Sequence, residues 1–357
     1  MEIRIRERLR ELAEDAPTGR SLPTTVRRRA RRRIGVTLAV GAVGIAVVTF
    51  GVSEALRTVA RREVRPAQQP GASAFERARG WIAIGGAGIT AVDPSDPSNR
   101  VGLTRRPDAF DRPLAWSPDG SMLLFLSNPI TDRDFPERNL FVLRADGTVA
   151  QLTTSGGVIG GSFSPDGTEV VFARITGFRE DEAVDSLFVV PADGGTPRRI
   201  EDGGEGPAFS FPAWSPDGEQ VLYFGRFRDG ADDAPGLAGT NADGTGDGFL
   251  VNDLLLPEVE EATAGLAWSP DGTRLAFAGT SEAGHSAVYV VGADGTALTE
   301  VVGGDDARYA WPTWSPDGSR IAFVRDTRVF TIAVDGSDLR EMAGAPADGR
   351  IAWNPAA

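Results

Sequence analysis

The sequence lacks cysteine and lysine altogether and holds a single histidine among its 357 residues. The absence of cysteine excludes disulfides, thiolate metal ligands and a cysteine nucleophile. A Ser-His-Asp triad would have to use that one histidine, His285, with Ser281 or Ser286 as its nucleophile, but the sequence contains no G-x-S-x-G nucleophile elbow. We therefore interpret His285 as a solvated loop residue and expect the protein not to be an enzyme.

Net positive charge is confined to the N-terminal part of an acidic chain, whose formal net charge is −13 at pH 7. Residues 1–33 hold 11 arginines against 5 acidic residues, and residues 53–79 hold 6 against 3. Residues 80–357 are accordingly strongly acidic. Because contacts with phosphate require net positive charge, we exclude nucleic acid as a partner of this acidic part.

An apolar run without charge lies near the N-terminus, over residues 34–52. At about 1.5 Å per residue, a helix of this length spans roughly the 30 Å hydrocarbon layer of a bilayer. Arginine occupies six of the seven positions from Arg27 to Arg33, directly before the run. The positive-inside rule then predicts a single-pass signal anchor with its N-terminus in the cytoplasm. The alternative is a cleavable signal peptide, which the length of the run and of the preceding segment disfavours.

The segments on either side of the predicted transmembrane helix differ in character. Residues 1–33 form a basic cytoplasmic segment, in which Ile5, Leu9 and Leu12 have the spacing of one helical face. This segment is either a partner-binding helix or a fraying tail, because so short a helix is marginal alone. Residues 53–79, which include several prolines and glutamines, are predicted to be a linker that holds the following domain away from the bilayer.

A tetrapeptide, Ser-Pro-Asp-Gly, recurs five times in the rest of the chain. Its spacings are 47, 51, 54 and 46 residues, which are typical of propeller blades. Each copy fits a type I turn, with serine first, proline at its fixed φ second and glycine fourth. An aromatic residue precedes each serine and is predicted to end an inner strand. The copies begin at Ser117, Ser164, Ser215, Ser269 and Ser315.

Two further strands are predicted after each tetrapeptide. An aromatic residue six positions after each aspartate, such as Phe125, shares one face of a buried second strand with an aliphatic residue two positions earlier. A third strand then ends at an Asp-Gly hairpin turn, such as Asp146-Gly147. Residues 237–240 make only a weak third strand, so the third blade is expected to depart from the pattern.

Two fragments remain at the ends of the repeat region. Residues 351–355 match an inner strand with Asn354 in place of serine, whereas residues 81–84 and 89–92 match second and third strands that lack a first. Together they are predicted to form a sixth blade, closed by both termini of the domain, which removes unpaired sheet edges. The predicted fold class is therefore all-β, a six-bladed β-propeller of four-stranded blades over residues 80–357, preceded by a single transmembrane helix.

The repeated pattern Trp-Ser-Pro-Asp-Gly, Phe, Tyr/Phe-Val and Ala-Asp-Gly-Thr resembles the WD-repeat-like blades of TolB-like propellers over residues 80–357. The resemblance implies an extracytoplasmic scaffold that binds other proteins through loops on one face. The periplasmic TolB protein also has an α/β domain before its propeller; we expect a membrane anchor in its place, so the role in envelope division does not carry over. The arginine-rich segment on a single-span anchor is also similar to actinobacterial membrane proteins that regulate sigma factors, although the cysteine-histidine zinc motif of many of them is absent.

Loops that break the repeat are the candidate contacts for a partner, because rigid scaffolds carry binding residues on their loops. The third-blade connection includes a leucine run, Leu254–Leu256, which is either an exposed interaction patch or a buried outer strand. The Ser-Pro-Asp-Gly aspartates are explained better by their own turns than as a ring of carboxylates. The candidate loops are residues 131–138, 178–185, 229–236 and 247–263.

One segment, Asn241–Gly248, resembles the first half of a calcium loop, with oxygen ligands at alternate positions. Its twelfth position is Asn252 where such a loop needs a bidentate glutamate, and Asp243-Gly244 also occupies the normal hairpin register. We therefore expect no metal site and no cofactor.

These observations predict a monomeric, membrane-anchored propeller outside the cytoplasm that binds a protein partner. Two alternatives stay open. The first is a transmembrane, anti-sigma-like regulator whose residues 1–33 bind a cytoplasmic factor. The second is a propeller hydrolase with a central divalent metal, which would need carboxylate, asparagine or histidine side chains that converge on the channel.

Overall fold

The computed structural model describes residues 72–129, 138–179, 182–202, 210–229, 232–245, 249–250, 265–280, 284–346 and 350–355. The predicted cytoplasmic segment and the predicted transmembrane run, residues 34–52, lie outside these ranges. Within the described ranges, no helix is long and apolar enough to cross a membrane.

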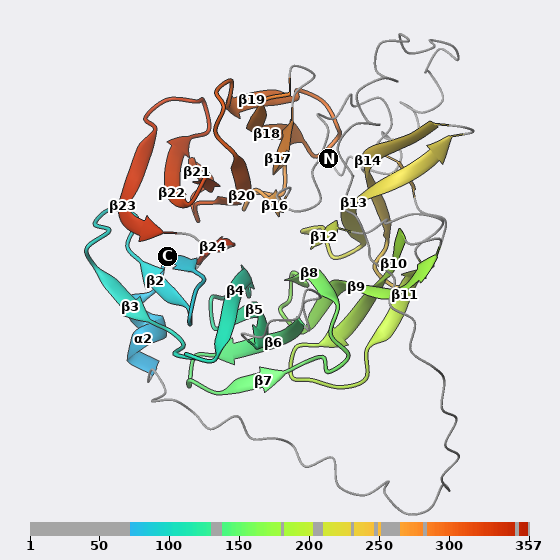
Figure 1. The fold of residues 1–357 in the computed structure, drawn as a ribbon, viewed down its shortest axis with the longest axis horizontal. Coiled ribbons are helices and arrows are strands. Elements are labelled where there is room, and N and C mark those ends of the chain that lie inside the picture. The colour runs from blue at the N-terminus through green and yellow to red at the C-terminus, as the bar shows by residue number, and fades with distance from the viewer. Residues whose placement is uncertain are drawn as a thin grey trace, which may run out of the picture. The chain divides into compact units, whose positions relative to one another are not determined.

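Six four-stranded antiparallel sheets form a ring around a central axis, as Figure 1 shows. In five of them the chain runs from the innermost strand outwards, which confirms the predicted six-bladed propeller. Their strands, blade by blade, are β4 (Ala109–Trp116), β5 (Met122–Pro129), β6 (Asn139–Arg144) and β7 (Val149–Gln151); β8 (Val158–Phe163), β9 (Glu169–Arg179), β10 (Glu182–Pro191) and β11 (Arg198–Asp202); β12 (Ser210–Trp214), β13 (Gln220–Asp229), β14 (Asp232–Asn241) and β15 (Phe249–Leu250); β16 (Leu266–Trp268), β17 (Arg274–Thr280), β18 (Ser286–Gly292) and β19 (Thr299–Val302); β20 (Tyr309–Trp314), β21 (Arg320–Arg325), β22 (Arg328–Ala333) and β23 (Arg340–Pro346).

The sixth blade is assembled from both ends of the domain, as predicted. Its strand order is β24 (Ile351–Trp353), β1 (Ile82–Ile84), β2 (Thr90–Val92) and β3 (Arg100–Gly102). Strand β24 supplies the inner strand and pairs with β1 in antiparallel register, Ile82 opposite Trp353 and Ile84 opposite Ile351. The C-terminal strand therefore closes the ring.

Each Ser-Pro-Asp-Gly segment forms a turn stabilised by its own side chains. In the first copy, Gly120 N donates to Ser117 O at 2.8 Å, and Gly120 has a positive φ of 69°. The Ser117 hydroxyl accepts from Met122 N at 2.9 Å and donates to Asp119 Oδ1 at 2.6 Å. The hydrogen bond from Ser117 is the main reason that the pKa of Asp119 lies below its usual range. The aspartates are thus turn residues rather than a carboxylate ring.

The hydrophobic core is divided into layers between neighbouring blades. One layer joins blade six to blade one through Ala83, Ala91, Leu123 and Phe125. The aromatic residue predicted on each second strand is buried. In four blades it also contacts an aromatic ring on the third strand, with ring centroids 5.4 to 6.0 Å apart. The buried residues are Phe125, Phe172, Tyr223, Phe277 and Phe323.

Helix α2 (Ala72–Arg77) falls within the segment that the sequence indicates as a linker, and it packs on the propeller. The Phe75 ring contacts Trp116 edge-on at 5.3 Å between centroids. Asn354, which replaces the usual serine, donates from Nδ2 to Ala78 O at 3.1 Å, directly after the helix. The departure from the repeat at Asn354 therefore joins the C-terminal strand to this N-terminal helix.

Two of the predicted irregular loops are ordered extensions of strands. Strands β9 and β10 stay paired as far as Arg179 opposite Glu182, and β13 and β14 as far as Asp229 opposite Asp232. The prediction of irregular loops at 178–185 and 229–236 was therefore wrong for all but residues 180–181 and 230–231, which lie outside the described residues. The third strand predicted at 237–240 is present, as part of the ten-residue β14. An antiparallel ladder uses backbone groups, so segments poor in strand-favouring side chains can continue it.

The other two predicted loops fall almost entirely outside the described residues. Of 131–138 only Arg138 is described, and of 247–263 only Phe249 and Leu250, which pair with Gly239 and Ala238 as the outer strand of blade three. The leucine run at 254–256 also lies outside the described residues.

Candidate functional site

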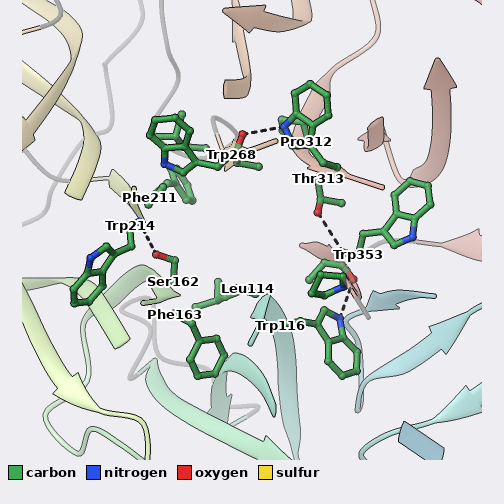
Figure 2. A pocket seen from close by; sticks show the side chains of 18 of the residues that line it. Leu114, Trp116, Ser162, Phe163, Phe211, Trp214, Trp268, Pro312, Thr313 and Trp353 are labelled. Carbon is green, nitrogen blue, oxygen red and sulfur yellow. Dashed lines mark hydrogen bonds between the residues drawn. The ribbon is translucent and has the colours of Figure 1, made fainter. Parts of the chain in front are cut away.

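A cavity of about 390 Å³ lies on the axis of the propeller, and the inner strands of all six blades line it. Figure 2 shows the labelled side chains around its open centre. The inner strands all run in the same direction along the axis, because each blade repeats the same antiparallel order. Their C-terminal ends carry the Ser-Pro-Asp-Gly turns, and we call that side of the ring the turn face. Their N-terminal ends and the β9–β10 and β13–β14 hairpins mark the opposite side, the hairpin face.

Tryptophans at the ends of three inner strands donate to backbone carbonyls, and two of them join neighbouring blades. The indole N–H of Trp116, labelled in Figure 2, donates to Ala352 O at 3.2 Å. The indole N–H of Trp314 donates to Ala267 O at 3.0 Å. Trp353 donates to Gly80 O at 2.7 Å. These tryptophans satisfy backbone carbonyls of an adjacent inner strand or of the segment before β1, so their role is structural.

Two other aromatic residues of the cavity wall have an unusual backbone conformation. Phe211 and Trp311 have φ values of 52° and 50°, and each lies at a register shift of its inner strand. A bulky side chain at positive φ costs on the order of 1–3 kcal/mol, and such residues cluster at functional sites. The sequence analysis missed both, although each begins an aromatic-Pro-x-Trp segment, 211–214 and 311–314, that the repeat comparison could have found.

One charged side chain lines the cavity among the residues described, and the sequence analysis missed it as well. Arg350, directly before β24, is 7% exposed. Its Nη2 donates to Ile159 O at 2.6 Å, and its guanidinium lies over the Phe211 ring at 4.8 Å. Burial lowers its pKa to about 9, with further contributions from repulsion by Arg138 and Arg112.

Three buried nitrogen atoms of the cavity wall have no hydrogen-bond partner among the described residues. They are Arg350 Nη1, Trp268 Nε1 and Trp311 Nε1. All three are donors, and the described lining contains no aspartate or glutamate. The cavity therefore combines apolar walls with N–H groups that lack an acceptor.

The residues considered as catalytic or metal ligands do not meet in this cavity. His285 is half-buried in the β17–β18 hairpin and does not line it, and Ser286 Oγ accepts from Tyr309 N at 3.0 Å. In the candidate calcium loop, Asp243 Oδ1 accepts from Thr245 N at 2.8 Å, which makes an ordinary hairpin turn. Ser281 and residues 246–248 lie outside the described residues. No group of three or more histidine, aspartate or glutamate side chains within the described ranges is arranged to hold a metal ion.

Comparison with known proteins finds similarity of fold. A TolB-type protein from Agrobacterium tumefaciens is 21% identical, with a TM-score of 0.55 over 77% of this chain and 94% of that chain. TolB from Acinetobacter baumannii is 18% identical, with a TM-score of 0.59 over 81% of this chain and 68% of that chain. A structure of a nidogen/laminin complex contains a chain that is 11% identical, with a TM-score of 0.59 over 77% of this chain and 97% of that chain.

No protein-family model matches the sequence, and no curated protein matches it. Identities of this size establish the architecture alone. The chain is a TolB-like six-bladed β-propeller in its fold.

Proposed function

We propose that this chain is a non-enzymatic, membrane-anchored scaffold that binds a protein partner through the hairpin face of an extracytoplasmic propeller. The observation that carries the proposal is the central cavity, which has apolar walls, unpaired donors and, in its described lining, no carboxylate or histidine. Its volume of about 390 Å³ lies in the usual range of small-ligand sites, so it suits a side chain or a short segment of a partner. The TolB-like fold, which also occurs in a nidogen/laminin complex, supports a role in protein binding.

The hairpin face offers a partner more than the cavity. Strand β8 begins at Val158, opposite Arg174, but β9 continues five residues further to Arg179. Five residues extend a strand by roughly 16 Å, so the β9–β10 hairpin stands well above the start of the inner strand. Strand β13 likewise continues beyond Phe224, which pairs with the first residue of β12. The two hairpins of neighbouring blades would give a partner a raised wall beside the cavity.

The proposed location of the protein rests on its N-terminal sequence. Residues 34–52 would cross the membrane, the arginine-rich residues 1–33 would lie in the cytoplasm, and the propeller would lie outside it. The metal-dependent hydrolase and the anti-sigma-like regulator have no specific support from the described part of the chain. We therefore retain a single proposal.

The topology can be tested because the natural chain has no cysteine. A single substitution, Thr176→Cys or Ser21→Cys, therefore introduces the only reactive thiol. We expect a membrane-impermeant maleimide to label Thr176→Cys in intact spheroplasts, and to label Ser21→Cys only after the membrane is permeabilised. The reverse pattern would contradict the proposed orientation, and recovery of both variants in the soluble fraction would contradict the anchor.

Partner binding can be tested with the same thiol in the full-length chain. Thr176 is exposed on the extension of β9, and Leu339 is exposed just before β23 on the turn face. After attachment of a benzophenone maleimide and irradiation of cells, we expect a discrete protein adduct with Thr176→Cys and none with Leu339→Cys as the matched control. Adducts of equal yield from both positions would indicate nonspecific proximity, and an adduct from Leu339→Cys alone would exclude the hairpin face as the binding surface.

A further inference from the structure

We propose that the Arg350 end of the central cavity is a binding subsite for a carboxylate attached to an apolar group. This inference rests on the proposed function only in assigning the carboxylate to a protein partner. It starts from Arg350, a cation that is 7% exposed in the propeller axis and that has an unpaired Nη1. Buried charges in proteins are ordinarily paired, because an isolated ion loses its hydration without compensation.

The contacts of Arg350 with the described residues include no counterion. Its guanidinium donates to one backbone carbonyl, Ile159 O, and lies over the Phe211 ring. The carbonyl oxygen and the face of the aromatic ring each carry partial negative charge and orient the guanidinium, but neither is a counterion. Among the described residues, no salt bridge involves Arg350.

Two neighbouring arginines increase the positive potential at this point. Repulsion from Arg138 and Arg112 adds to the burial effect that lowers the pKa of Arg350. Arg138 is half-buried, and its buried Nε has no partner among the described residues. Arg112 donates to the amide oxygen of Asn128 at 2.6 Å, and its charge also acts against the burial that raises the pKa of the Asp111 carboxyl. The three guanidinium groups come from separate segments and repel one another, which favours an anion beside Arg350.

The remaining polar atoms of the cavity favour the same ligand. Trp268 and Trp311 line the cavity, and the buried Nε1 of each, which can only donate, has no acceptor among the described residues. A ligand that satisfies this set must present acceptor oxygens rather than donors. A carboxylate presents acceptor oxygens and also supplies a negatively charged counterion for the Arg350 guanidinium.

The apolar walls define the rest of the ligand. Leu114, Phe211, Trp268 and Trp311 line the cavity with several prolines. A bare inorganic anion would leave these surfaces without a contact, whereas a carboxylate with an aromatic or aliphatic body would bury apolar area against them. The two sources of such a group are the C-terminus of a partner peptide and a free apolar acid, and we assign it to the peptide.

The test uses the full-length chain in detergent micelles, labelled with fluorotryptophan, whose seven tryptophans can be assigned by Trp→Phe substitution. We expect phenylpropanoate to shift the fluorine signals of Trp268 and Trp311 saturably, and to leave that of Trp81, which does not line the cavity, unchanged. The neutral phenylpropanamide should bind at least about tenfold more weakly, because a charge-assisted hydrogen bond is lost. Arg350→Met should reduce phenylpropanoate binding by a similar factor.

The controls separate folding from recognition. A thermal melt of Arg350→Met reports whether the variant folds; if it does not, the comparison of acid with amide on the unaltered chain decides. Equal affinity for acid and amide, or no saturable shift at Trp268 and Trp311, would overturn the subsite. Acetylated glycyl-phenylalanine, as free acid and as C-terminal amide, distinguishes the sources. Binding of its acid form supports a peptide terminus, whereas binding of phenylpropanoate alone overturns that assignment independently of the outcome of cross-linking at Thr176.

Discussion

Deletion of residues 350–357 is expected to remove most of the stability of the propeller. The deletion takes away β24, the inner strand of the sixth blade, in which Ile351, Ala352 and Trp353 are buried. Loss of a buried tryptophan side chain alone costs about 3–5 kcal/mol, a large part of the 5–15 kcal/mol by which domains are commonly stable. We expect the melting temperature of the full-length chain, followed by circular dichroism, to fall by about 10 °C or more.

The same deletion should change the association state. Without β24, strand β1 has an unpaired edge that faces the axis, and unpaired edges promote association between chains. Size-exclusion chromatography should show aggregates. The matched control is Leu339→Ala, which truncates an exposed apolar side chain and should change stability by less than about 0.5 kcal/mol. A truncated chain that keeps its melting temperature and stays monomeric would show that β24 does not close the ring.

The parts of the fold that sequence could predict are those determined by local chemistry. Each turn is specified by residues within five positions, as the Ser117 hydroxyl shows by bonding both Asp119 and Met122. The sixth blade could be predicted because Trp353 and Pro355 preserve the end of the repeat on either side of Asn354. The partner of Asn354, the Ala78 carbonyl after α2, could not, because the contact spans most of the chain and exists only in the closed ring.

The candidate site depends still more on long-range contacts. In the sequence, Arg350 is one arginine among 37, and nothing nearby indicates burial. It becomes part of the cavity because ring closure brings its side chain to Ile159, 191 positions earlier in the chain. The bulges at Phe211 and Trp311 were also invisible to strand periodicity, since a bulge breaks the alternation that the periodicity measures. Pattern analysis thus found the scaffold and missed the residues that line its centre.

A second large effect is expected at Asp111 on β4, whose side chain is 0% exposed. Its Oδ2 accepts from Thr104 Oγ1 at 3.0 Å, and Thr104 Oγ1 in turn accepts from Ile89 N at 2.8 Å, next to β2 of the sixth blade. The Asp111 backbone also exchanges two hydrogen bonds with Gly86 in that blade. Asp111 therefore joins blade one to blade six at a position separate from β24.

Asp111→Ala should cost about 3 kcal/mol at pH 7, because it leaves Thr104 without an acceptor and removes the carboxylate that lies 3.6 Å from Arg106. Asp111→Asn should cost much less, since its amide oxygen can still accept from Thr104. Burial is the largest influence on the pKa of Asp111 and raises it above the ordinary value of 3.8. An acid with a raised folded pKa contributes stability below its unfolded pKa and loses that contribution as the pH rises through the folded pKa.

The stability of Asp111→Asn relative to the unaltered chain should therefore improve as the pH rises from about 3 to 7. Urea unfolding at several pH values measures this difference, and Asp108→Ala, which truncates an exposed aspartate close by, is the matched control. An Asp111→Asn variant as unstable at pH 7 as Asp111→Ala would show that the charge itself is required. That result would make the ion pair with Arg106, rather than the Thr104 hydrogen bond, the second connection that holds the ring closed.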